Sequence, residues 1–144
     1  MPDDAPWTRN AAYVIVRDDE GRLLLSRISA ELPDLEGQWS MPGGGLEWGE
    51  HPVDAARREL EEETGITADI GEVVAIFSRA FVRSPERPRP SLHMIGHVFR
   101  GTNPHGELRH EATGTSNQAA WFTLDEVRAL PHVELVDFCL DLVD

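Results

Sequence analysis

The sequence predicts a protein of the α/β class, in which helices cover a β-sheet. Three observations support this class: β-rich runs flank a glycine-rich loop, one segment shows helical periodicity, and the chain ends in helical patterns. The expected order is hairpin, loop, helix, strands and helix, so strands and helices do not alternate strictly. The chain of 144 residues has the length of one ordinary domain, and we expect residues 1–144 to form a single domain.

The first half of the chain is expected to form a hairpin, a long loop and a helix. Residues 11–28, AAYVIVRDDEGRLLLSRI, contain two β-rich runs around the turn signal DDEG, which predicts a hairpin. Residues 29–51 are rich in glycine and proline, and long irregular segments inside a domain are usually functional or disordered. A helix is expected over residues 52–64, because Pro52 suits a first turn and Gly65 can end the helix in a left-handed conformation.

The second half is expected to add strands and two further helices. Strand-like runs cover residues 72–82 and 91–101, and a segment rich in proline and arginine separates them. Residues 118–124 are expected to form another strand, residues 125–130 a short helix, and residues 133–143 a terminal helix. This order fits a sheet covered by helices.

Composition and charge argue against several classes of protein. The chain has 26 acidic and 13 basic side chains and a net charge of −13, so its field repels polyanions and disfavours an extended nucleic-acid surface. No apolar stretch reaches the length of a membrane span, and the start MPDDAPWTRN does not resemble a secretory signal. The single Cys139 cannot form an internal disulfide, and we expect a buried thiol in a reducing cytoplasm.

The helix predicted over residues 52–64 concentrates acidic side chains on one face. Glu59, Glu62 and Glu63 follow the i, i+3, i+4 pattern, so their side chains are expected to lie side by side. The neighbouring stripe is assigned to the core and carries Val53, Ala56, Leu60 and Thr64. Like charges repel, and burial would raise the pKa of each carboxyl, but a divalent cation removes both difficulties. Carboxylate oxygens are ligands of the kind that Mg²⁺ prefers.

The glycines before the helix decide between two interpretations of this face. Taken alone, an acidic face is typical of a solvated amphipathic helix. Gly43, Gly44 and Gly45, however, allow positive φ angles and a close approach of the backbone to a ligand. The N-terminus of the helix also offers free N–H groups to anions. The glycine loop and the acidic helix together indicate metal-assisted phosphate chemistry.

The segment from Gly44 to Ile66 resembles the signature of a known family, the Nudix box. Its specified positions are Gly44, Glu50, Arg58, Glu59, Leu60, Glu62, Glu63, Gly65 and Ile66, and each is filled as in the complete box. The flanking segments QWSMPGGGLE and AAWFTLDEV are also similar to that family. The resemblance implies a Nudix hydrolase domain, an α/β/α sandwich around a mixed central β-sheet.

The resemblance also implies a role for each residue of the box. Glu59, Glu62 and Glu63 would bind Mg²⁺ or Mn²⁺. The carbonyl of Gly44 would add a ligand, and Arg58 would orient the carboxylates. The residues expected to support the loop and the helix are Glu50, Gly43, Gly45 and Gly65.

The implied reaction is hydrolysis of a phosphoanhydride in a nucleoside diphosphate linked to another group. A carboxylate takes the proton of the attacking water; Glu62 is the first choice, and Glu59 and Glu63 are the other helix candidates. In parts of the family the base comes from a later loop. The acids of that loop here are Glu107 and Glu111; Glu111 is the better candidate, and the alternative for both is a solvated loop acid.

Two further residues lie in the loop before the helix. Glu47 is a candidate for the outer surroundings of the metal, and its alternative is an exposed loop residue. Trp48 is a candidate for contact with the substrate, because its ring can stack on a base. The arginines of residues 79–89 could receive phosphates or form a solvated surface loop.

The sequence does not decide which substrate the protein uses or which oligomeric state it forms. Candidate substrates are nucleoside triphosphates, nucleotide sugars such as ADP-ribose, and dinucleoside polyphosphates; a small nucleotide is favoured over capped RNA. The alternative function is a catalytically silent Nudix-like domain that binds a nucleotide or a sugar as a regulator. An isomerase on this scaffold would need a catalytic cysteine, and Cys139 falls in the wrong region. Monomer and homodimer are both open.

Overall fold

The structure is a computed structural model that describes residues 5–111 and 113–143. Its elements in chain order are β1 (Trp7–Val16), β2 (Leu23–Ile28), β3 (Trp39–Ser40), β4 (Gly43–Gly45), α1 (Pro52–Thr64), β5 (Thr67–Phe81), β6 (Leu92–His105), β7 (Ser116–Phe122), α2 (Leu124–Ala129) and α3 (Glu134–Leu140). The expected domain bounds at residues 1 and 144 lie outside the described residues, as do the first four residues of the MPDDAPWTRN segment.

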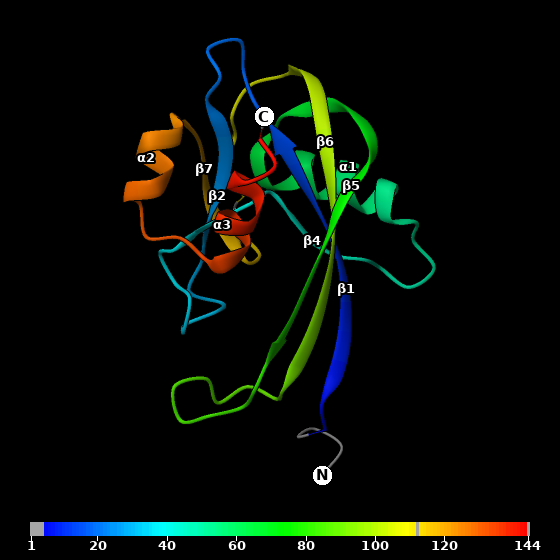
Figure 1. The fold of residues 1–144 in the computed structure, drawn as a ribbon, viewed down its shortest axis with the longest axis vertical. Coiled ribbons are helices and arrows are strands. Elements are labelled where there is room, and N and C mark those ends of the chain that lie inside the picture. Colours follow the sequence, from blue (N-terminus) through cyan, green and yellow to red (C-terminus); the bar gives the residue numbers. More distant parts are fainter. Residues whose placement is uncertain (1–4, 112, 144) are drawn as a thin grey trace.

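Two β-sheets form the centre of the molecule (Figure 1). The larger sheet has the strand order β4-β1-β6-β5, in which β1 and β6 run parallel from the pair Trp7–Leu92 to the pair Val16–Gly101. β4 and β5 pair antiparallel with their neighbours, so the larger sheet is mixed, as the family resemblance predicts. The smaller sheet has the order β3-β2-β7 and is antiparallel.

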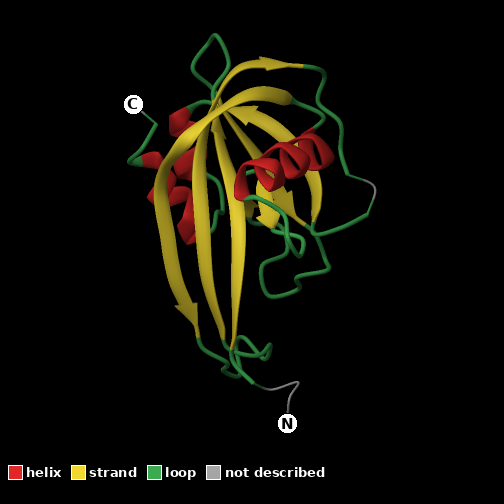
Figure 2. Ribbon diagram, turned by 90° about the vertical axis from the view of Figure 1, so that its right-hand side faces the viewer, coloured by secondary structure: helices red, strands yellow, loops and turns green. Residues whose placement is uncertain are grey.

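Helices cover the sheets on two sides (Figure 2). Side chains alternate along a strand, so successive residues of β1 are buried on opposite faces. One face, which carries Tyr13, packs against Val127 of α2 and Val136 of α3. The other face, which carries Val14, packs against Leu60 of α1. These layers confirm the predicted α/β/α sandwich.

The hairpin predicted over residues 11–28 is wrong, although both strands and the turn between them are present. The strands meet at an antiparallel bridge between Arg17 and Leu23 and then enter different sheets. The edges of β1 are taken by β4 and β6, which leaves β2 no edge of β1 to pair with. The turn is held by the Asp18 carboxylate, which accepts hydrogen bonds from the backbone N–H and Nε of Arg22 at 2.8 and 2.7 Å.

Several boundaries differ from the predictions. The loop expected over residues 29–51 contains β3 and β4, so the three glycines pair with β1 as a short strand. β5 begins at Thr67 and β6 ends at His105, because their antiparallel ladder is longer than the apolar runs. α1 has its predicted bounds, whereas α3 ends at Leu140. Among the described residues, no helix has both the length and the apolar character needed to cross a membrane.

Candidate active site

The ends of α1 are fixed by two residues. His51 caps the start, where its Nδ1 accepts a hydrogen bond from the N–H of Val53 at 3.1 Å. Gly65 ends the helix with φ 78° and donates its N–H to the carbonyl of Glu61, as predicted for a left-handed residue. Leu60 is buried against the sheet, and this orientation directs part of the acidic face toward the glycine strand β4.

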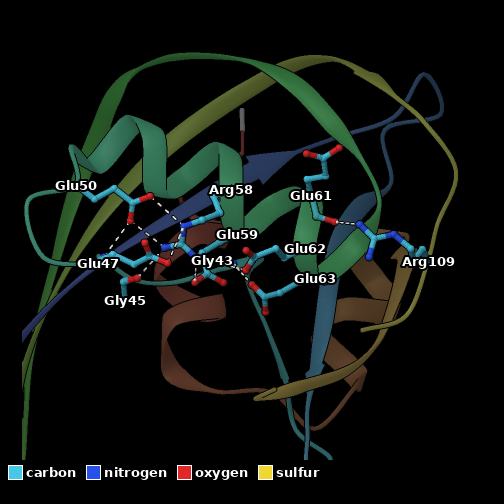
Figure 3. A network of polar contacts seen from close by, with 10 residues as sticks. All are labelled: Gly43, Gly45, Glu47, Glu50, Arg58, Glu59, Glu61, Glu62, Glu63 and Arg109. Atoms are coloured by element: carbon cyan, nitrogen blue, oxygen red, sulfur yellow. Dashed lines mark hydrogen bonds and ion pairs between the residues drawn. The ribbon is translucent and has the colours of Figure 1, made fainter. Parts of the chain in front are cut away.

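Arg58 is the centre of a hydrogen-bond network on α1 (Figure 3). Its Nε and Nη2 donate to the Glu50 carboxylate at 2.9 and 2.8 Å. Nη2 also donates to the carbonyl of Gly45 at 3.2 Å. Nη1 donates to Glu59 at 3.0 Å and to Glu62 at 3.3 Å. One guanidinium thus joins the loop before the helix to two of the carboxylates predicted to bind metal.

Glu50 links the loop to the helix. Its carboxylate accepts the N–H of Glu47 at 2.9 Å in addition to the two bonds from Arg58. The hydrogen bonds from Arg58 lower the pKa of Glu50 to about 2, so this carboxyl is ionised at neutral pH. The Glu47 carboxylate lies 3.7 Å from Nε of Arg58, and its side chain is 71% exposed. Glu47 therefore borders the network from the solvent side.

The backbone of β4 lies directly against two carboxylates of α1. Gly43 has φ 151° and donates its N–H to Oε2 of Glu63 at 2.7 Å. A Cβ at Gly43 would overlap the carbonyl of Ala12. A Cβ at Gly44 would lie 2.9 Å from Cδ of Glu59. Gly43 has room for glycine alone, and a side chain at Gly44 would displace the Glu59 carboxylate, which explains how the strand can approach the acidic face so closely.

Burial makes three of the carboxyl groups difficult to ionise. Glu63 is 5% exposed, and burial raises its pKa well above the ordinary value. Burial also raises the pKa of Glu59, against the opposing charge and hydrogen bond of Arg58. The pKa of Glu111 is raised by burial and by the negative charges of Glu59 and Glu62. The fold thus brings Glu111, from the loop before β7, close to the helix carboxylates.

The chemistry of these carboxylates fits a divalent cation. In the part of the chain that the structure describes, no group of three or more His, Cys, Asp or Glu side chains is already placed to hold a metal ion. Arg58 engages Glu59 and Glu62, and Glu63 accepts the bond from Gly43. Their oxygens are nevertheless hard donors of the kind that Mg²⁺ and Mn²⁺ bind. A cation would also offset the burial and the mutual repulsion that raise the pKa values of Glu59 and Glu63.

A cavity of about 280 Å³ opens beside β4 and Glu63. Its walls are largely apolar and include Tyr13, Phe77 and Met94; the Tyr13 hydroxyl donates to Sδ of Met94 at 3.2 Å. Arg9 also lines it. The sequence does not predict this set, because β1, β5 and β6 become neighbours only in the folded sheet. The alternation along β1 does contain one usable signal, since it places Arg9 and Tyr13 on the same face.

Other candidate side chains lie away from this centre. Trp48 is fully exposed and is not part of the cavity wall. In the arginine-rich segment, Arg79 pairs with Glu134 at 3.0 Å, and Arg89 pairs with Asp34 at 2.7 Å. These two arginines bind carboxylates of the chain itself.

The fold and the site together define an α/β/α protein whose first helix carries an arginine-organised set of glutamates beside a glycine strand. The NUDIX domain family matches this chain over residues 7–137. The chain belongs to the NUDIX family, as its box predicts.

Curated relatives match parts of the chain. An RNA pyrophosphohydrolase from Erythrobacter litoralis is 43% identical over 67 residues, which cover 46% of this chain and 40% of that protein. A MutT-like protein from Streptomyces ambofaciens is 32% identical over 118 residues, which cover 82% of this chain and 65% of that protein. Diphosphoinositol polyphosphate phosphohydrolase 2 from Rattus norvegicus is 36% identical over 75 residues, which cover 52% of this chain and 40% of that protein. The matches thus span between 40% and 65% of the length of these relatives.

Solved structures share the fold over nearly the whole chain. A MutT NUDIX hydrolase from Burkholderia pseudomallei superimposes with a TM-score of 0.79 and 25% identity, covering 96% of this chain and 99% of that one. A MutT protein from Methanosarcina mazei superimposes with a TM-score of 0.75 and 21% identity, covering 98% of this chain and 95% of that one. The second likeness concerns the fold alone.

Proposed function

We propose that this chain is a metal-dependent hydrolase that cleaves the phosphoanhydride of a nucleoside diphosphate linked to another group. Glu59, Glu62 and Glu63 would hold Mg²⁺ or Mn²⁺, with the carbonyl of Gly44 as a further ligand. The observation that carries this proposal is the network of Arg58, which binds Glu59 and Glu62 and ties them to the loop. Membership in the NUDIX family and relatives named as pyrophosphohydrolases support it.

The residues of the site divide the work of such a reaction. When bound, the cation neutralises charge on the diphosphate and lowers the pKa of a nearby water. Arg58 keeps Glu59 and Glu62 aligned, and the N–H of Gly43 holds Glu63 in place. Glu62 is our first choice for the general base, because its side chain is 48% exposed and can reach a water. Glu111 is the second candidate, since it approaches the same carboxylates from a loop distant in the sequence.

Among nucleotide derivatives we favour a small one. The cavity of about 280 Å³ beside Glu63 has room for one compact group, and its apolar walls suit an uncharged ring system. The net charge of −13 opposes the binding of a long polyanion. The relatives include an RNA pyrophosphohydrolase and a diphosphoinositol polyphosphate phosphohydrolase, so we expect residues outside the box to select the substrate.

The test is release of phosphate or pyrophosphate from a panel of nucleotides with Mg²⁺ and with Mn²⁺. The panel holds nucleoside triphosphates, ADP-ribose, other nucleotide sugars and dinucleoside polyphosphates. We expect turnover that needs the cation and that is lost in Glu62→Gln and in Glu63→Gln. Glu61→Gln is the matched control, because this exposed glutamate of the same helix points away from the network.

Two outcomes would contradict the proposal. Absence of turnover with every member of the panel would leave binding as the function, and a nucleotide that raises the melting temperature would then support the silent regulatory domain. Equal loss of turnover in Glu61→Gln and Glu62→Gln would show that the helix carboxylates act through general charge rather than as a specific site.

A further inference from the structure

The cavity wall contains a cation that the network around Arg58 does not use. Arg9 lies on β1, on the same face as Tyr13, and its side chain is half-buried at the cavity. Among the described residues, none of the hydrogen bonds and ion pairs involves the guanidinium of Arg9. Its charge acts on Glu59 and on Tyr13, yet no group of the described residues accepts its N–H groups. A half-buried guanidinium whose five N–H groups lack acceptors is costly, since these are strong donors. Its position therefore suits an anion that enters from solution.

Arg9 and the metal-site carboxylates lie on either side of the edge strand β4. A Cβ at Gly44 would meet the carboxylate of Glu59, whereas a Cβ at Gly45 would lie 2.9 Å from Nε of Arg9. Neighbouring residues of a strand face opposite sides, so Glu59 and Arg9 approach β4 from its two faces. β4 is the last strand of its sheet and its outer edge carries no further strand among the described residues. A phosphate chain bound at the carboxylates can therefore extend past this edge into the cavity, where Arg9 and Glu63 both line the wall.

The cavity has a second unmatched polar group. The hydroxyl of Ser116 lines it, the residue is 3% exposed, and no hydrogen bond within 3.5 Å reaches the hydroxyl. It does lie near enough to Glu111 to oppose part of the rise in the pKa of that carboxyl. The remaining walls near it are apolar, with Phe77 and Met94 among them. A buried hydroxyl facing such a space is satisfied when a ligand supplies a hydrogen bond.

The charges of the wall restrict what the cavity can hold. Arg9 is its one arginine or lysine among the described residues, and the carboxylates of Glu63 and Glu134 also line it. A group that carries several phosphates would place its negative charges against these acids with one fixed cation to offset them. An uncharged group joined to a single phosphate fits the wall better.

We propose that Arg9 binds the phosphate that joins the cleaved anhydride to the group in the cavity, and that Ser116 hydrogen-bonds that group. The inference rests on the proposed function in that the anhydride is cleaved, but the binding itself does not require hydrolysis. It assigns the substrate class as an uncharged nucleoside on a phosphate chain and disfavours polyphosphorylated distal groups. Arg9 is thus a substrate-binding residue that selects for the linking phosphate.

The experiment measures binding without turnover, in buffer that contains EDTA. Isothermal titration compares nucleoside monophosphates with the matching nucleosides on wild type, Arg9→Gln, Arg9→Lys and Ser116→Ala. We expect wild type to bind the monophosphate more tightly than the nucleoside. In Arg9→Gln the ratio of the two dissociation constants should fall by about ten- to a hundredfold, the usual cost of losing a hydrogen bond to a charged group. Arg9→Lys should restore part of it, because the charge returns without the planar fork. Ser116→Ala should weaken nucleoside and monophosphate by the same factor.

Arg57→Gln is the charge-matched control, since Arg57 pairs with Asp54 at 3.3 Å on the exposed side of α1. Equal preference for monophosphate in wild type and Arg9→Gln, or an equal loss in Arg57→Gln, overturns the inference. So does a wild type that binds neither compound. Preference for monophosphate that depends on Arg9, together with no turnover on the nucleotide panel, would uphold the inference and reject the proposed function. Turnover on the nucleotide panel with a KM unchanged in Arg9→Gln would uphold the proposed function and reject the inference.

Discussion

Arg58 and Glu50 form a two-point ion pair in which Nε and Nη2 donate to the two carboxylate oxygens at 2.9 and 2.8 Å. The side chains are 24% and 14% exposed, so water competes only partly with the pair. The pair fixes the plane of the guanidinium, and the third nitrogen is thereby aimed at Glu59 and Glu62. The geometry of the acidic face therefore depends on a residue of the preceding loop.

Replacing Arg58 with lysine should damage the site although the positive charge is kept. Lysine cannot bond both oxygens of Glu50 and also reach Glu59 and Glu62, because it lacks the planar fork. We expect kcat/KM to fall by roughly 10- to 100-fold, the usual cost of losing a group that orients metal ligands. Steady-state kinetics with Arg57→Lys alongside provide the check. An Arg58→Lys enzyme with wild-type turnover would contradict the orienting role.

The pair should also make stability depend on pH in the acidic range. The pKa of Glu50 is lowered to about 2 by its hydrogen bonds from Arg58, below its ordinary value of 4.5. Between these values the folded protein binds fewer protons than the unfolded chain, so the contribution is present above pH 4.5 and is lost as the pH falls toward 2. Urea unfolding of wild type and Glu50→Gln should show a gap in stability at pH 6 that narrows at pH 3. If wild type and Glu50→Gln differ in stability by the same amount at pH 6 and at pH 3, the ion pair of Glu50 with Arg58 is not the source of the difference.

Gly43 should tolerate substitution much less than Gly49. Both have positive φ, at 151° and 80°, but a Cβ at Gly43 would overlap the carbonyl of Ala12, whereas nothing lies within 4 Å of one at Gly49. We expect Gly43→Ala to lower the free energy of unfolding by more than about 3 kcal/mol, and Gly49→Ala by about 1–2 kcal/mol from backbone strain alone. Chemical denaturation measures both. Similar losses would mean that the overlap relaxes without cost.

The part of the site that could be predicted from the sequence is the part encoded in one segment. The bounds of α1, the left-handed Gly65 and the shared face of the glutamates follow from local spacing, and the structure shows all three. His51 caps this helix with an imidazole nitrogen, whereas serine, threonine, aspartate and asparagine are the usual capping residues, so residue type alone does not indicate this cap.

What could not be predicted depends on strand pairing between distant segments. The hairpin predicted over residues 11–28 is wrong because β4 and, from far along the chain, β6 occupy the two edges of β1. The same pairing builds the cavity, since Arg9 and Tyr13 meet Met94 only when β1 and β6 run parallel. Glu111 likewise reaches the helix through the path of a loop that carries no periodic pattern.

The thiol of Cys139 should be unreactive in the folded protein. Cys139 is fully buried in the core between the sheet and α3, and burial raises its pKa to about 12. We expect labelling by a thiol reagent at pH 8 to be slower than in denaturant by on the order of a hundredfold or more, because reaction requires local opening. The chain has a single cysteine, so the signal needs no assignment. Rapid native labelling would show that this end of the fold opens readily.

Replacing Glu63 with glutamine should separate a metal site from a purely structural acid. The Glu63 side chain is buried at 5% exposure, and its burial opposes ionisation, while the amide oxygen introduced by Glu63→Gln could still accept the bond from the N–H of Gly43. In EDTA at pH 7.5, we therefore expect Glu63→Gln to melt at the same temperature as wild type or higher, because a neutral amide avoids the cost of ionising a buried carboxyl. Adding Mn²⁺ should raise the melting temperature of wild type and leave that of the variant unchanged, since binding to the folded state alone stabilises it. A variant that melts lower in EDTA and still responds fully to Mn²⁺ would assign Glu63 to the framework of the fold and remove it from the metal site.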